Sequence, residues 1–372
     1  RLGYAISEPL PAVTLMLRVG EGAEQEWQFE QLPGKFAVDL TGLPAGDHEV
    51  RGEVRVGEVR VRLPTQRVSL IADAEARLKA LEERLGREGG EPAAAGGATV
   101  LATLKESQRL VRRLLEKDDA ETDLPGDRLL REAEELAVDA NRPGGATLWQ
   151  RPGEYWVTLS NGKRTQRARL LVPAGEPPAG GARPLVVALH GAGGSENMFF
   201  DAYGAGKIVR LCEARGWLLV TPGSSPLGGG LELPEVVAAL KAHYGVDAGR
   251  VAMVGHSMGA MQGLQLAGRN PQALKSLAIL GGGRPVRSPA GLREVDLFAA
   301  AGAEDFGRGG VRQVIAQWRG AGLQVEERDY PQVEHLGVVQ VALDEVFAQF
   351  EKSFARNEGA KPQPDSAGDR PR

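Results

Sequence analysis

The residues best suited to chemistry in this chain are a serine and its glycine neighbours, Gly255-His256-Ser257-Met258-Gly259. An apolar run over residues 250–254 precedes them, and a helix-like stretch begins near Ala260. A strand that turns sharply into a helix can hold a serine hydroxyl above the edge of a sheet, provided that small residues flank it where the backbones crowd together. Short patterns of this kind also arise by chance, so the rest of the chain has to support it. With that support, the pattern predicts Ser257 as a nucleophile.

A serine hydroxyl is a weak nucleophile at neutral pH and needs a base within hydrogen-bond reach, most often a histidine. Four of the five histidines are poorly placed. His256 lies beside the serine and His190 before a glycine-rich loop, while His243 lies near the opposite strand ends and His48 in another domain. His335 lies in a loop after a predicted strand, where the carboxyl ends of parallel strands converge. It is therefore the predicted base.

The histidine needs a carboxylate that fixes its tautomer, and the expected chain order is serine, acid, histidine. Asp305 follows the predicted strand 297–301 in the turn 302–305. Glu304 is the neighbouring alternative. The spacing from Gly302 favours Asp305 as the acid and makes Glu304 a solvated loop charge.

A tetrahedral intermediate places negative charge on the former carbonyl oxygen, so two backbone N–H donors should face it. The Met258 amide, at the start of the helix, is one candidate. The loop 189–194 should supply the other, with Ala192 as the first choice and Gly193 as the next. A plain glycine-rich turn and a phosphate cradle are alternatives, but the loop lacks the lysine and Ser/Thr of a Walker sequence.

The elements that must position these residues occupy segment 146–356, where strands and helices alternate from Tyr155 onward. This order predicts a mostly parallel sheet with crossover helices. Strands are expected at 185–189, 217–221, 250–254, 277–280, 297–301 and 324–329. Helices are expected at 208–214, 234–244, 260–269, 311–318 and 338–354. The tail 357–372 has the composition of a disordered segment.

The first 145 residues show two other patterns. Over residues 1–66, apolar residues alternate with period two, which predicts a small immunoglobulin-like β-sandwich with a hairpin at Gly57-Glu58 and His48 as a structural corner residue. Over 67–145, apolar residues three and four apart predict a helical connector, beginning with a helix near Ser69. A third helix is expected to be capped by Asp127. Packing on a neighbouring domain is favoured for these helices; a homodimer through a coiled coil and a lid are the alternatives.

Composition narrows the function classes. The chain has 372 residues, 42% of them hydrophobic, which is enough for buried cores. Its net charge of −4 argues against a nucleic-acid partner. No apolar run is long enough to span a membrane. The single cysteine, Cys212, excludes an intrachain disulfide and reads as a buried helix residue. Two features predict a secreted or periplasmic protein: a β-sandwich joined to the predicted domain of alternating strands and helices, and the missing initiator methionine.

Residues from about 150 to 355 resemble the α/β-hydrolase family, on the strength of residues 190–197 (His-Gly-Ala-Gly-Gly-Ser-Glu-Asn) and 255–259. Within it they are similar to esterase D and feruloyl-esterase-like proteins, and share much with dienelactone hydrolases, polyhydroxybutyrate depolymerases and peptidases related to prolyl oligopeptidase. The resemblance implies ester hydrolysis without a metal or organic cofactor. It makes Ser257, Asp305 and His335 the triad and Ala192 and Met258 the oxyanion donors. Gly259-Ala260-Met261 departs from the usual second glycine.

These features predict a serine hydrolase of carboxylic esters that forms an acyl-enzyme. Gly193, Phe199 and Phe306 are expected at the substrate site, although both aromatic residues could instead fill the core. The short connection between the strands ending at Leu280 and starting near Val295 leaves no room for a large cap, so an open site for aromatic, carbohydrate-linked or polymeric esters is expected. A serine peptidase and a binding protein with a vestigial hydrolase domain are the alternatives.

Overall fold

A computed structural model of the protein describes residues 12–29, 36–87, 97–116, 124–139, 151–176, 181–223 and 230–358. The chain divides into two compact units, one built from residues 1–90 and 104–138 and the other from 91–103 and 139–372. Helix α2 (Gly97–Glu116) contributes to both. Most of the predicted tail lies outside the described residues, and the predicted division into four segments stays a prediction. No described helix is long and apolar enough to cross a membrane.

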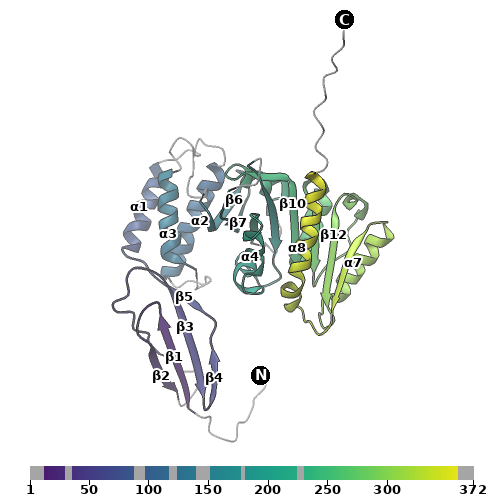
Figure 1. Ribbon diagram of the computed structural model, residues 1–372. Helices are drawn as coiled ribbons and strands as arrows, with labels where there is room; N and C mark the ends of the chain where they lie inside the picture. The colour runs from purple at the N-terminus through teal and green to yellow at the C-terminus, as the bar shows by residue number, and fades with distance from the viewer. Residues whose placement is uncertain are drawn as a thin grey trace. The chain divides into compact units, whose positions relative to one another are not determined.

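The second unit is built on an eight-stranded sheet (Figure 1). Its strand order is β13-β12-β11-β10-β8-β9-β7-β6. Every neighbouring pair from β13 to β9 is parallel, and the pairs β9-β7 and β7-β6 are antiparallel. The predicted mostly parallel sheet is thus confirmed. The strands are β6 (Gly153–Ser160), β7 (Thr165–Val172), β8 (Arg183–Leu189), β9 (Leu218–Pro222), β10 (Val246–His256), β11 (Ser276–Leu280), β12 (Asp296–Gly302) and β13 (Val325–Tyr330).

Helices cover both faces of this sheet because the central strands are apolar on both sides. Val254 and Ala278 belong to a core cluster shared with α4 and α8, whereas Met253 and Leu277 lie against Gly263 of α6. Such alternation follows from the period of two in a strand. The helices are α4 (Lys207–Glu213), α5 (Leu233–Lys241), α6 (Met258–Arg269), α7 (Arg308–Gly320) and α8 (Gly337–Glu358), with shorter turns η2 (Met198–Ala202), η3 (Pro271–Ala273) and η4 (Pro289–Leu292).

The outer edge of β6 is covered by the first turns of α2. The Thr158 amide donates to Thr103 Oγ1 at 2.8 Å, and the Ser160 amide donates to Thr99 Oγ1 at 3.1 Å. Both threonines are buried. Backbone groups on an open edge strand invite pairing with another chain, so these hydroxyls satisfy donors that would otherwise be exposed.

The first unit contains one antiparallel sheet of five strands in the order β2-β1-β3-β4, with β5 also pairing with β3. The predicted hairpin at Gly57-Glu58 is present, since Val56 pairs with Val59 across it. A sandwich needs a second facing sheet, and all strands of this unit's described residues belong to one sheet, so the predicted immunoglobulin-like sandwich is not confirmed. The strands are β1 (Val13–Val19), β2 (Gln25–Phe29), β3 (Gly46–Val56), β4 (Val59–Arg62) and β5 (Gln66–Leu70).

Three helices complete the first unit: α1 (Ala74–Arg87), the later part of α2, and α3 (Gly126–Asp139). Their apolar stripes are buried, with Leu78 and Leu130 fully inaccessible. The prediction of a helix starting near Ser69 is wrong. Ser69 belongs to β5, because its backbone pairs with Asp47 of β3, and the helical turn begins only at Ala74. Neither a coiled-coil dimer nor a lid is tested by these contacts.

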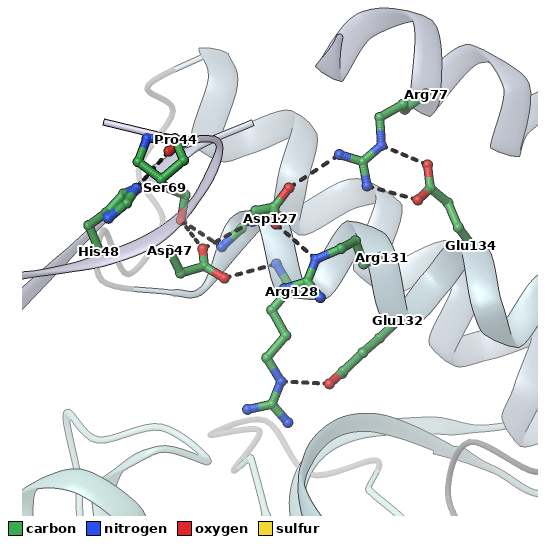
Figure 2. A network of polar contacts seen from close by, with 11 residues as sticks. Pro44, Asp47, His48, Ser69, Arg77, Asp127, Arg128, Arg131, Glu132 and Glu134 are labelled. Carbon is green, nitrogen blue, oxygen red and sulfur yellow. Dashed lines mark hydrogen bonds and ion pairs between the residues drawn. The ribbon is translucent and has the colours of Figure 1, made fainter. Parts of the chain in front are cut away.

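A polar network joins the sheet of the first unit to α3 (Figure 2). The carboxylate of Asp47 accepts the amides of Asp127 and Arg128 at 3.1 and 2.9 Å, and Ser69 Oγ accepts the Gly126 amide at 2.8 Å. The first amides of a helix have no acceptor within it, so a carboxylate there accepts their hydrogen bonds. Its negative charge also interacts favourably with the positive end of the helix dipole. The cap is therefore supplied by Asp47 from the sheet, not by Asp127 as predicted. Asp127 instead pairs with Arg77 and Arg131.

The predicted corner role of His48 agrees with the structure. Its Nε2 lies 2.8 Å from the carbonyl oxygen of Pro44, four residues earlier (Figure 2). A carbonyl only accepts, so Nε2 carries the proton and donates. The histidine thereby ties the turn before β3 to the strand.

We expect the substitution Asp47→Ala to destabilise the protein by about 1 kcal/mol or more, the usual cost of losing a helix N-cap. Chemical unfolding followed by circular dichroism would measure it. The control is Asp47→Asn, whose amide oxygen still accepts one hydrogen bond and should cost less. Equal stability of all three forms would contradict the assignment of Asp47 as the cap of α3.

Candidate active site

Ser257 lies at a sharp turn between β10 and α6. Its backbone has φ 55° and ψ −116°, a positive φ that residues with a side chain rarely adopt. The turn is possible because its flanking residues have no Cβ: one added to Gly259 would lie 2.0 Å from the Leu189 oxygen, and one added to Gly255 would lie 2.4 Å from the Gly259 oxygen. The Ser257 amide is also bonded to the Leu280 carbonyl at 2.9 Å. Strand and helix thus fix the hydroxyl at the carboxyl edge of the sheet.

The structure brings together the three residues that the sequence singles out. His335 Nε2 lies 2.9 Å from Ser257 Oγ, and His335 Nδ1 lies 2.7 Å from Asp305 Oδ1. A carboxylate only accepts, so Nδ1 carries the proton and Nε2 presents its lone pair to the serine hydroxyl. The Asp305 side chain is fully inaccessible and that of His335 is 12% exposed. This arrangement can remove a proton from Ser257 and return it.

Asp305 is held in place by its own turn. Its Oδ1 accepts the Gly307 amide at 2.7 Å as well as the His335 proton. On the other side, a Cβ added to Gly281 would lie 2.6 Å from Oδ2, so the carboxylate packs directly against the backbone after β11. Glu304 is exposed, and its amide bonds to the Val333 carbonyl. The geometry therefore selects Asp305 over Glu304 as the partner of the histidine.

Two backbone segments border the serine where an oxyanion could form. Met258 is the first residue of α6, so its amide has no acceptor within the helix. The loop after β8 approaches from the other side: a Cβ on Gly191 would lie 3.3 Å from the Ser257 Cβ. The next residues, Ala192 and Gly193, are exposed, and Gly193 has φ +76°. Of the predicted donors, Met258 thus adjoins the nucleophile and Ala192 follows a residue that contacts it, and the role of both stays a proposal.

The family model described as the alpha/beta hydrolase fold matches residues 184–369, which is half of the chain. This chain belongs to the α/β-hydrolase family. The match agrees with the parallel sheet and with the elbow at Ser257, and it confirms the family predicted from the sequence. No curated protein matches the chain.

Among solved structures, this α/β-hydrolase is similar to the feruloyl esterase module from Clostridium thermocellum (17% identity, 53% of this chain and 88% of that chain, TM-score 0.45). It is also similar to an S-formylglutathione hydrolase from Agrobacterium tumefaciens (18% identity, 55% and 96%, TM-score 0.42). A third is a ferulic acid esterase from Anaeromyces mucronatus (13% identity, 55% and 92%, TM-score 0.43).

The two predicted aromatic contacts of the hydrolase have different outcomes. Phe306 is 82% exposed, and its ring centroid lies 3.8 Å from that of His335. Phe199 has no exposed surface and packs edge-on against Tyr203 in the core. The structure does not place Phe199 where a substrate could touch it, because the turn η2 directs this side chain inward. The alternative, that it fills the core, holds for Phe199.

A buried polar chain links the loops on the two sides of the site. Tyr203 Oη lies 2.6 Å from His256 Nδ1 and accepts the Gly191 amide at 3.3 Å, while His256 Nε2 lies 2.9 Å from the His335 carbonyl oxygen. That carbonyl must accept, so Nε2 carries the proton and Nδ1 accepts the tyrosine hydroxyl proton. The chain thus runs from the glycine-rich loop to the backbone of His335. The sequence shows only that His256 lies beside the serine, and nothing in it marks Tyr203 as the partner of this histidine.

Burial lowers the pKa of His256 to about 4, and the neighbouring His335 ring adds to this effect. Neutral His256 can accept the Tyr203 proton, whereas a protonated ring could not. The polar chain therefore requires an uncharged His256 throughout the neutral range.

This pKa has a consequence for stability. In the unfolded chain His256 should titrate near 6.5, so between about pH 6.5 and 4 the unfolded state binds a proton that the folded state does not. Stability due to this group is therefore present above that window and lost as the pH falls through it. We expect His256→Gln to be less stable than wild type at pH 7, with the difference shrinking by up to about 3 kcal/mol toward pH 4. Urea unfolding at several pH values would measure both curves, and parallel curves would contradict the expectation.

Proposed function

We propose that this protein is a serine hydrolase that cleaves carboxylic esters through an acyl-enzyme. The observation that carries the proposal is the hydrogen-bonded row from Ser257 Oγ through His335 to Asp305. A neutral imidazole with its lone pair toward the hydroxyl is the arrangement needed for general-base catalysis, and the carboxylate stabilises the imidazolium that forms.

In the first step, Ser257 Oγ bonds to the ester carbonyl carbon while its proton moves to His335 Nε2. The amides of Met258 and Ala192 would donate to the resulting oxyanion, each such donor being worth about 3 to 4 kcal/mol in related sites. Collapse of the intermediate breaks the bond to the alcohol, which leaves with the proton from Nε2. Water then attacks the acyl group in the same way, releasing the acid and restoring the Ser257 hydroxyl.

The surroundings of His335 support a substrate with an aromatic or otherwise bulky group. Phe306 presents an exposed ring beside the imidazole, which could stack on an aromatic acyl or alcohol group. The described connection between β11 and β12, residues 281–295, contains only the short turn η4. A site without a cap at this point suits a carbohydrate-linked or polymeric ester. Export of the protein and dimerisation through its helices stay predictions.

Replacing the nucleophile tests the proposal most directly. Ser257→Ala should lower kcat for a p-nitrophenyl ester by about 10⁴-fold or more, as removal of a nucleophilic serine does elsewhere. It should also abolish labelling by a fluorophosphonate probe. Thermal unfolding of the variant serves as the check that the fold is intact. Turnover near the wild-type level in a folded Ser257→Ala protein would end the proposal, and a wild type that neither reacts nor labels would favour a vestigial domain.

The choice between the two adjacent acids gives a second test with its own control. Asp305→Asn should lower kcat by about 10³- to 10⁴-fold, because an amide cannot hold the histidine in the required tautomer. The matched variant Glu304→Gln removes a neighbouring charge and should change kcat by less than about twofold, since exposed charges contribute little. Steady-state kinetics on the same ester decides the matter, and the reverse order of effects would reject Asp305.

A further inference from the structure

A groove of about 470 Å³ lies along α6, the helix that begins next to the nucleophile. One wall is a stripe of α6 that starts at Met261 and ends at Arg269, and the other is the segment 284–288 that follows β11. Met261 is four residues beyond Ser257, about 6 Å along a helix. The groove therefore begins roughly one helical turn from the serine.

The second wall is also tied to the nucleophile. A Cβ added to Gly282 would lie 2.7 Å from the Ser257 Cα, so the chain leaving β11 is in contact with the elbow. Arg284 is two residues further, within about 7 Å of Gly282 even in an extended chain. Val286 is then fixed on α7, because its amide donates to Gln317 Oε1 at 2.9 Å and its carbonyl accepts from Gln317 Nε2 at 2.6 Å. The wall is held by its neighbours before any ligand arrives.

The lining of the groove is strongly basic. It contains Arg269, Arg284 and Arg287 and no acidic side chain. Arg269 is paired with Glu232 at 3.0 Å. Arg284 and Arg287 are exposed, and within the described part of the chain neither makes a hydrogen bond or an ion pair. Two guanidinium groups that have no charge partner among the described residues thus line one groove.

We propose that this groove binds an oxyanionic group, a carboxylate or a phosphate, carried by the ester substrate. The inference rests on the proposed esterase function and adds a substrate class to it: an acidic ester whose charged group lies about one helical turn from the scissile bond. Guanidinium groups bind such oxyanions through paired N–H donors, and their planar fork loses less freedom per hydrogen bond than a flexible ammonium group does. The anion would supply a charge partner that the described residues do not offer to Arg284 and Arg287.

The test compares three p-nitrophenyl esters: the butyrate, the glutarate half-ester and the 4-phosphonobutyrate. In the double variant Arg284→Gln/Arg287→Gln, kcat/KM for the two charged esters should fall roughly 5- to 20-fold, as expected for two partly exposed charge contacts. The butyrate should change by less than about twofold, and the loss on the charged esters should shrink in 0.5 M salt as screening increases. Whichever charged ester shows the larger fall in kcat/KM in the double variant carries the preferred group, the carboxylate of the glutarate or the phosphonate that stands for a phosphate.

The matched control is Arg293→Gln, which removes an exposed arginine of the same connection outside the groove. It should leave all three esters unchanged. If wild type hydrolyses the esters and the double variant affects charged and uncharged ones equally, or affects none, the groove proposal is overturned while the esterase assignment stands.

A direct binding measurement separates this inference from the esterase proposal. Calorimetric titration of the Ser257→Ala protein with the glutarate half-ester needs no turnover. A Kd that rises 5-fold or more when Arg284 and Arg287 are also replaced supports the groove, whether or not wild type hydrolyses any ester. Binding that is absent, or that does not depend on these arginines, rejects it.

Discussion

The close approach of three backbones at the elbow is the constraint on which the site depends. Gly259 of α6 touches the carbonyl of Leu189 in β8, and Gly255 of β10 touches Gly259 in turn. No side chain larger than hydrogen fits at either position, so helix, strand and glycine-rich loop meet at their minimum separation. That separation brings the loop residues after Leu189 close to Ser257, whose neighbour Met258 begins the helix. The strained backbone of the serine is maintained because the surrounding sheet over-determines it.

A second layer of contacts keeps the remaining parts in register. His335 and Asp305 reach the serine from loops after β13 and β12, and loops are the more variable part of a fold. Here Asp305 is held by the Gly307 amide and by packing against Gly281, and the His335 backbone is held by His256. Asp305 Oδ1 accepts hydrogen bonds from the Gly307 amide and from His335 Nδ1, whereas the buried Oδ2 has no hydrogen-bond partner among the described residues. Turning the carboxylate away would leave the Gly307 and His335 donors unsatisfied, which favours the observed arrangement. The low pKa of His256 keeps the polar contacts of this ring from being lost to protonation near neutral pH.

Sequence reasoning found the row of Ser257, His335 and Asp305 because its logic is local: each follows a recognisable strand, and parallel strands bring such ends to one edge. It succeeded less well wherever a side chain's direction depends on tertiary packing. The short distance in sequence between Phe199 and the glycine-rich loop predicts a place near the substrate, yet the turn η2 points this side chain into the core. The cap of α3 comes from Asp47, eighty residues earlier, which no local capping pattern can reveal. Periodicity likewise extended the first helix back to Ser69, where pairing with β3 prevails over helical spacing.

The segment after β11 serves both the nucleophile and the groove. Gly282 packs on Ser257, while Val286, four residues later, is bonded on both sides to Gln317 of α7. These contacts hold the backbone of the connection at Gly282 and Val286. Its exposed side chains make neither contact, so we expect that they can be replaced without moving Ser257. Arg284 and Arg287 lie on either side of Val286 in the sequence, and their side chains are exposed. In the proposed groove the charge of Arg284 and Arg287 selects the substrate, whereas other residues position Ser257. The charge at these two positions can therefore change without altering the catalytic geometry.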